Sequence, residues 1–209
     1  MRRWIYPLLV LGCGFAQPAL AYDSSWFRSD TWSGEYPNGF TMLADKSIAI
    51  RAEPDPAAPS NVTCDLKKNA TYHPWNESRS RSDELKFVSF SKIAPYEMTR
   101  AYTAAVTRES DQAEVRLKLK KGARWNYLVY GAEGSFLIEY GGVRYFADQD
   151  LAEKARSLDP SADEVKPDEW LGLVCANGSK GWLLMREIPE ESGFGSPNIT
   201  EYGAAEDAR

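Results

Sequence analysis

The stretch EVRLKLKKGARWNYLVY, residues 114–130, decides the fold class, because apolar and polar residues alternate through it. Val115, Leu117 and Leu119 alternate with charged residues, which is the period-two pattern of a strand with one buried and one solvated face. After a lysine–glycine turn, a second extended segment runs to Tyr130. The pattern predicts a protein built mainly of antiparallel β-strands.

The same alternation continues on both sides of this stretch. The polar residues from Glu109 to Gln112 are suited to the turn of a hairpin between the strands that flank them. Gly141 and Gly142 tolerate the positive φ angles of a second tight turn. In chain order, strands are predicted at residues 47–51, 62–66, 70–73, 85–93, 96–106, 114–120, 125–130, 136–140, 143–146, 170–176 and 182–188.

Two segments lack the strand pattern. Residues 148–158 are the one predicted helix, with Leu151, Ala155 and Leu158 on one face and acidic residues in the first turn. Residues 190–209 combine glycine, proline and acidic residues without periodicity. We therefore expect a flexible tail there.

The first 21 residues have the features of a secretory signal peptide. Arg2 and Arg3 precede an apolar run that is too short to span a bilayer, and the small residues Ala19 and Ala21 end the segment. We predict cleavage before Tyr22 and a periplasmic or secreted protein. No later apolar run is longer, so no transmembrane segment is expected in the mature chain.

A lipoprotein anchored through Cys13 is the alternative to soluble export. Residues 10–13 read Val-Leu-Gly-Cys, which is similar to a lipoprotein box in which the cysteine is acylated and becomes the first mature residue. Leu11 stands where a small residue is usual.

Charge argues against nucleic acid as a partner. The chain has 30 acidic and 25 basic residues, a net charge of −5, and loss of the two arginines of the signal would make this −5 − 2 = −7. Binding a polyphosphate requires clustered lysine and arginine. The one basic cluster, at residues 118–121, is typical of a solvated strand face and turn.

Two of the three cysteines, Cys64 and Cys175, remain after removal of the signal. In an oxidising compartment such a pair most simply forms one disulfide, although two buried free thiols are the alternative. Because the bridge would close a loop of roughly a hundred residues, the loop-entropy model gives it up to about 4 to 5 kcal/mol.

Two segments resemble bacterial SH3-like (SH3b) domains. Ile48–Trp75 reads as an apolar strand ending in arginine, a proline-rich loop and a strand that leads to a leucine–basic–turn motif. Glu169–Ile188 is similar to the closing hairpin, with Gly181 and Trp182 as its Gly-Trp pair. The resemblance implies an SH3-like barrel and a binding role, directed at peptidoglycan or at other proteins.

The long stretch between the two segments can be accommodated in two ways. Either residues 22–189 form one SH3-like domain that contains an inserted antiparallel β meander and one short helix, or residues 38–95 and 96–189 form two SH3-like units. A bridge from Cys64 to Cys175 fits the first arrangement better, because it joins the opening half to the closing hairpin.

Few residues offer catalytic chemistry. His73 is the only histidine, and its aromatic neighbours favour a structural or binding role. Carboxylate pairs such as Asp148 with Asp150, or Asp168 with Glu169, could bind calcium or act as acid and base, but acidic pairs in turns are usually only solvated. We therefore predict no catalytic residue, no metal site and no cofactor.

Aromatic residues are the strongest functional signal, although most of them are expected to fill the β core. Some can instead line a shallow groove for a sugar or a peptide. The first candidates for ligand contacts are Tyr72, His73, Trp75 and Trp182.

The sequence as a whole favours an exported, non-enzymatic binding module of the bacterial cell envelope that recognises peptidoglycan or an envelope protein. One alternative is an inhibitor or immunity-type protein whose acidic surface blocks a secreted enzyme or toxin. A second alternative, a hydrolase that uses two carboxylates, requires a deep cleft in which the acids face each other.

Overall fold

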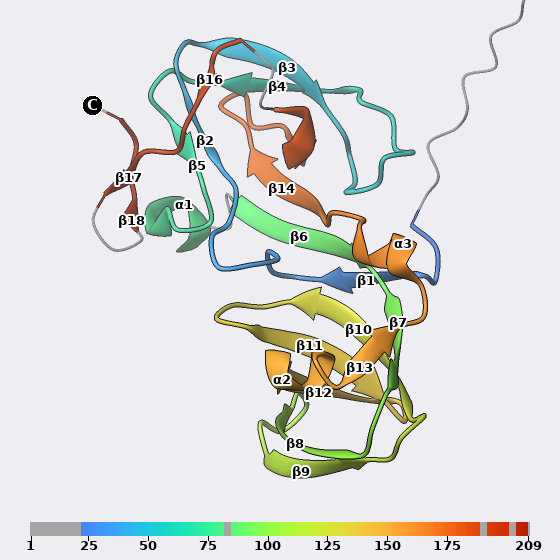
Figure 1. The fold of residues 1–209 in the computed structure, drawn as a ribbon. Coiled ribbons are helices and arrows are strands. Elements are labelled where there is room, and N and C mark those ends of the chain that lie inside the picture. Colours follow the sequence, from blue (N-terminus) through green and yellow to red (C-terminus); the bar gives the residue numbers. More distant parts are fainter. Residues whose placement is uncertain (1–21, 82–84, 189–191, 201–203, 209) are drawn as a thin grey trace, which may run out of the picture.

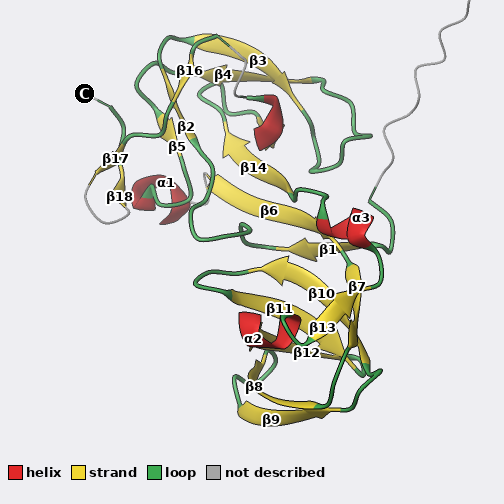
Figure 2. Ribbon diagram, viewed as in Figure 1, coloured by secondary structure: helices red, strands yellow, loops and turns green. Residues whose placement is uncertain are grey.

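The computed structural model describes residues 22–81, 85–188, 192–200 and 204–208. The predicted signal peptide, with Cys13, lies outside these residues. The described chain folds mainly into antiparallel strands, as Figure 2 shows, and helices are few and short. The prediction of a mainly β protein is therefore confirmed.

A four-stranded sheet forms the centre of what we call the outer unit, residues 22–93 and 164–208. Its strands lie in the order β1-β6-β14-β15, and all neighbours are antiparallel. Their bounds are β1 Trp26–Ser29, β6 Leu85–Lys92, β14 Asp168–Val174 and β15 Lys180–Leu184. A 3-10 helix, η1 Met185–Glu187, follows β15 directly.

A hairpin and several short strands complete the outer unit. The hairpin consists of β3 (Lys46–Ile50) and β4 (Val62–Leu66), and Arg51 bridges it to Trp182 of β15. The short elements are β2 Phe40–Met42, β5 Thr71–Tyr72, α1 Glu77–Arg81, β16 Phe194–Gly195, β17 Ile199–Thr200 and β18 Ala204–Ala205.

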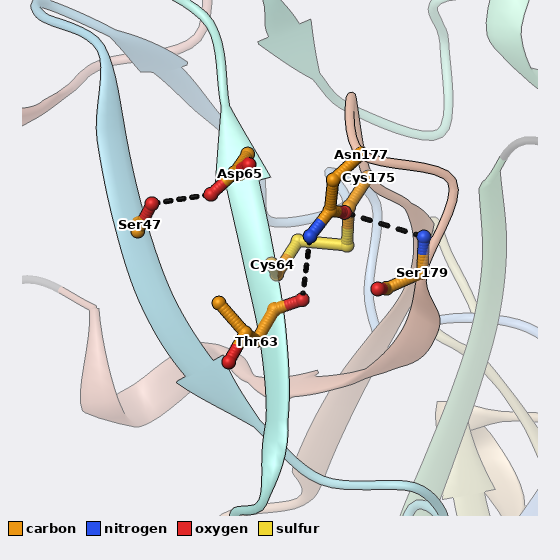
Figure 3. The surroundings of a disulfide bond; sticks show 7 residues. All are labelled: Ser47, Thr63, Cys64, Asp65, Cys175, Asn177 and Ser179. Carbon is orange, nitrogen blue, oxygen red and sulfur yellow. Dashed lines mark hydrogen bonds between the residues drawn. A yellow bond between two sulfur atoms is a disulfide. The ribbon is translucent and has the colours of Figure 1, made fainter.

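A disulfide between Cys64 and Cys175 ties this hairpin to the turn after β14 (Figure 3). Both cysteines are buried. The Asn177 side-chain amide donates to the Thr63 carbonyl oxygen at 3.0 Å, and the Ala176 backbone amide donates to the Asp65 carbonyl oxygen at 2.8 Å. The predicted disulfide is therefore confirmed, and two hydrogen bonds to the β4 backbone lie beside it.

A second sheet, with its own core, lies between β6 and β14 in the sequence and forms what we call the inserted unit, residues 94–163. Its strand order is β13-β7-β10-β11-β12-β8-β9. The bounds are β7 Ala94–Met98, β8 Tyr102–Arg108, β9 Glu114–Leu119, β10 Arg124–Tyr130, β11 Ser135–Tyr140, β12 Val143–Asp148, α2 Gln149–Ala152, β13 Ala155–Ser157 and α3 Pro160–Asp163. In Figure 1 this unit lies below the outer one.

The two units bury separate apolar clusters. Phe40, Leu66 and Leu171 belong to the core of the outer unit, whereas Trp125 and Ile138 belong to the core of the inserted unit. A smaller cluster joins them, in which Phe27 and Ile93 of the outer unit pack against residues of β10 and β11.

The strands form separate open sheets, whereas the sequence led us to expect a closed barrel. The strand expected at 96–106 divides into β7 and β8, with a bend at residues 99–100 between them. Because β7 pairs with β10 and β13 while β8 pairs with β9 and β12, this bend sends one alternating segment to opposite ends of a sheet.

The helix predicted at 148–158 is wrong in its second half. Only Gln149–Ala152 is helical, with Leu151 buried, and the chain then becomes extended as β13. Residues Ala155–Ser157 pair with β7, which would otherwise be an unpaired edge of the sheet. Pairing with a distant strand therefore outweighed the local helical pattern.

Within the expected flexible tail, the described residues 192–200 and 204–208 contact other parts of the outer unit. Phe194 of β16 packs against the outer core and pairs with Met42. The Asp207 carboxylate accepts hydrogen bonds from the Thr71 amide at 2.9 Å and the Arg79 guanidinium at 2.7 Å. These partners lie over 120 residues away in the chain, so no local sequence pattern predicts the contacts.

Candidate functional site

A groove of about 710 Å³ lies in the outer unit. Segments 38–40, 166–169 and 194–197 line it, together with Met185, Arg186 and Ile188 at and after η1. We call it the β14 groove, because the start of β14 forms one side. Its volume lies within the range of ligand sites, about 300 to 1,000 Å³.

Strand pairing brings these distant segments together. Phe194 of β16 lies opposite Met42 of β2, and Phe194 contacts Phe40 edge-on with ring centroids 4.9 Å apart. A Cβ atom at Gly195 would lie 2.8 Å from a methyl carbon of Leu43, so β16 runs close to this exposed side chain. The apolar side of the groove is therefore formed by Phe40, Phe194, Met185 and Ile188.

Asp168 is a buried carboxylate in this groove, with a relative exposure of 4%. The Tyr22 hydroxyl donates to its Oδ2 at 2.7 Å, and Arg186 forms an ion pair with its Oδ1. The same Tyr22 oxygen accepts from the Trp170 ring nitrogen at 2.8 Å. Burial raises the pKa of Tyr22, so this phenol remains protonated and can act as the donor.

Glu169 follows directly but points to the opposite side of β14, because successive side chains alternate along a strand. It accepts hydrogen bonds from the Asn38 side-chain amide and from the Ser33 backbone amide. Burial raises the pKa of Glu169 above its ordinary range, and these two donors oppose that effect. The two neighbouring carboxylates therefore have separate sets of partners.

His73 lies behind the groove wall and is fully buried. Its Nε2 atom donates to the Pro37 carbonyl oxygen at 3.0 Å, and its Nδ1 atom accepts from the Trp75 amide at 3.1 Å; these contacts assign the tautomer. Burial lowers the pKa of His73, which favours the neutral ring. A Cβ atom at Gly39 would lie 2.4 Å from the ring, so His73 supports the 37–39 segment at close range.

The structure brings together three of the four predicted ligand-contact residues. Tyr72 and His73 are buried, and Trp75 is partly buried, with its ring against His73 and against the exposed ring of Tyr36. Trp182 is separate from them. It packs in the cluster of Val88 and Trp170 on the central sheet, and its ring lies beneath Gly172.

Sequence reasoning missed most of the groove. Four groove residues belong to no sequence motif. Two of them lie in loops (Asn38 and Lys166), one in the 3-10 helix η1 (Arg186), and one in the segment that was expected to be flexible (Phe194). Asp168 and Glu169 were noticed only as an acidic pair. The other noticed pair, Asp148 and Asp150, is exposed at the start of α2.

No group of three or more His, Cys, Asp or Glu side chains that could hold a metal ion occurs among the described residues. None of the helices in the described part of the chain combines the length and the apolar character needed to cross a membrane.

Comparison of the chain with known protein families finds no matching family, and comparisons with curated proteins and with solved structures find no significant match either.

Proposed function

We propose that this chain is an exported, non-enzymatic binding module of the bacterial cell envelope, and that the β14 groove receives the peptide part of peptidoglycan. The observation that carries the proposal is the composition of the groove. One side is apolar, and the other presents the exposed cations Lys166 and Arg186 beside the buried carboxylate of Asp168.

Mixed charge suits a short peptide that itself carries both signs. The peptides of peptidoglycan contain free carboxylates, which Lys166 can attract, and free amino groups, which the carboxylate of Asp168 can attract. Their aliphatic side chains can cover Phe194, which is partly buried. Because the groove is open and preformed, binding would not require a large rearrangement.

The partners of the acidic groups support binding rather than catalysis. An acid–base pair needs two carboxylates that face a common substrate position. Asp168 and Glu169 point to opposite sides of β14 and are each engaged by structural donors. Both ring nitrogens of His73 are likewise engaged, and its ring is buried.

We also propose an SH3-like architecture for the outer unit, interrupted by the inserted unit. In support, the β3–β4 hairpin adjoins β15 through the bridge of Arg51 to Trp182, and η1 follows the Gly-Trp strand. The disulfide suggests an oxidising compartment, which agrees with a periplasmic or secreted location.

Sedimentation with insoluble peptidoglycan tests the proposed function. Residues 22–209 should cosediment, and a soluble peptidoglycan peptide should compete. Ser196→Trp places a large ring at an exposed position in the groove, and Lys166→Ala removes an exposed cation; each should weaken binding about tenfold while the melting temperature stays unchanged.

Two further variants complete the experiment. Lys180→Ala, which removes an exposed cation outside the groove, is the matched control and should bind normally. Trp75→Ala tests whether the Tyr36–Trp75 ring pair, 5.9 Å between centroids, extends the binding surface. Full cosedimentation of the Ser196→Trp variant would overturn the assignment to the groove.

A further inference from the structure

A second, smaller pocket lies where the outer and inserted units meet. Its volume is about 310 Å³. Residues at both connections between the units line it, one between β6 and β7 and the other between α3 and β14. Three tyrosine rings line it, those of Tyr96, Tyr127 and Tyr130, and the polar side chains of Ser91 and Asp163 join them. We call it the tyrosine pocket.

Ser91 is the unusual member of this pocket. It is 5% exposed, and its hydroxyl oxygen is buried without a hydrogen-bond partner in the described structure. Most buried polar groups in native proteins are satisfied, so an unpaired one beside a cavity points to a missing partner. Ser89, two residues earlier on the same strand, is satisfied, because it donates to the Thr31 carbonyl oxygen at 2.7 Å.

The tyrosines provide a second set of polar groups beside apolar ring surface. The Tyr96 hydroxyl donates to Asp163 Oδ1 at 3.0 Å, and Trp125 stacks on one face of the Tyr96 ring at 4.7 Å. Tyr127 is partly buried and lines the pocket. Burial raises the pKa of Tyr127, so this hydroxyl remains a donor at neutral pH.

We infer that the tyrosine pocket binds one hexopyranose ring. A pyranose has an apolar face of C–H groups, which stacks on the electron-rich face of a tyrosine ring, and a rim of hydroxyl groups that both donate and accept hydrogen bonds. Tyr127 supplies a hydroxyl partner and Asp163 supplies a carboxylate acceptor. Ser91 Oγ, which is buried in the free protein, becomes a partner when its side chain turns into the pocket. The volume is at the lower end of the range for ligand sites, which suits a single ring rather than a longer chain.

This inference goes beyond the proposed function, because the pocket and the β14 groove contain different side chains, Pro167 excepted. The pocket would bind the sugar whether or not the groove binds wall peptide. Since its residues come from both units, a bound sugar would also stabilise the contact between them.

Titration calorimetry on residues 22–209 tests the inference. The probes are methyl β-D-glucopyranoside and methyl N-acetyl-β-D-glucosaminide, with sorbitol as a polyol that has no ring face and phenol as a ring that has no polyol. We expect saturable binding of at least one glycoside and none of sorbitol or phenol. Ser91→Ala and Tyr127→Phe should each weaken that binding about five- to tenfold.

Matched variants separate binding from folding. Ser89→Ala and Tyr145→Phe change the same groups outside the pocket and should leave glycoside affinity unchanged. Ser91→Ala should not lower the melting temperature of the free protein, because the hydroxyl that it removes has no partner. Absence of glycoside binding at tens of millimolar, or unchanged affinity in both pocket variants, would overturn the inference and leave an ordered water as the partner of Ser91.

Discussion

At the residue scale, burial rather than sequence context determines what the single histidine does. Tyr72, Pro74 and Trp75 suggested from the sequence that His73 lies among aromatic rings, and the ring contact with Trp75 agrees. The sequence did not show that both ring nitrogens bind the backbone, one to Pro37 and one to Trp75. Those two contacts require the neutral ring.

A pH dependence of stability follows from His73. Burial lowers the pKa of His73 in the folded protein, and the hydrogen bond to Pro37 opposes this effect. In the unfolded chain the imidazole takes up its proton at about pH 6.5. The unfolded state therefore binds more protons below that pH, so the stability that His73 contributes is complete above about pH 6.5 and is lost as the pH falls.

Urea denaturation at about pH 7 and pH 5.5 measures this effect. The free energy of unfolding should fall further in the wild type than in His73→Gln, by up to about 1 kcal/mol. Carboxylates that both proteins share, such as Glu169, titrate in both and cancel in the comparison. Parallel pH profiles for the two proteins would contradict the assignment of a lowered pKa to His73.

At the element scale, the disulfide is the main covalent constraint on the outer unit. It joins β4 to the turn after β14 across a sequence separation of 111 residues, so the closed loop contains the whole inserted unit. Reduction should lower the free energy of unfolding by about 5 kcal/mol in the loop-entropy model.

Denaturant unfolding with and without reductant measures this loss. A Cys64→Ala, Cys175→Ala double variant of residues 22–209 is the control, since it should match the reduced wild type and show no response to reductant. If the oxidised and reduced midpoints coincided, the outer unit would be held by its apolar core alone.

The elements themselves were predictable to different extents. The alternating strand β9 was found to within one residue, because its side chains are alternately exposed and partly buried. Strand β11 was found equally well, although residues on both of its faces are buried. Most strands of two or three residues, such as β13 and β16, were missed, β5 excepted. So short a segment carries no periodicity, and its extended form depends on a partner far away in the chain.

At the scale of the whole molecule, the two clusters of buried residues suggest two folding units. The end of β6 and the start of β14 are neighbours, since Phe90 lies opposite Asp168, so Ser91, Lys92 and two added residues can form a four-residue connection in place of residues 93–167. With Asn-Gly as the two added residues, and Phe27→Ser to remove apolar surface uncovered by the deletion, the outer unit should still fold and form its disulfide.

Near-ultraviolet circular dichroism and thermal unfolding of this shortened chain test the division. A cooperative transition is expected both for it and for the isolated segment 94–163, each at a lower temperature than in the full chain, because the cluster that joins Ile93 to Leu128 is lost. Loss of cooperative unfolding in both pieces would show that the two clusters form one interdependent core.

The amino-acid sequence by itself determined the β class, the principal strands and the cystine, because alternation of polarity is local and two cysteines in an oxidising compartment allow one pairing. Only the tertiary structure decided the open sheets, the ending of α2 after one turn and the docking of the last residues. The groove and the tyrosine pocket were likewise decided only by the tertiary structure. Their side chains come from segments that meet only when distant strands pair, and no local pattern in a chain encodes which distant backbone will satisfy its hydrogen bonds.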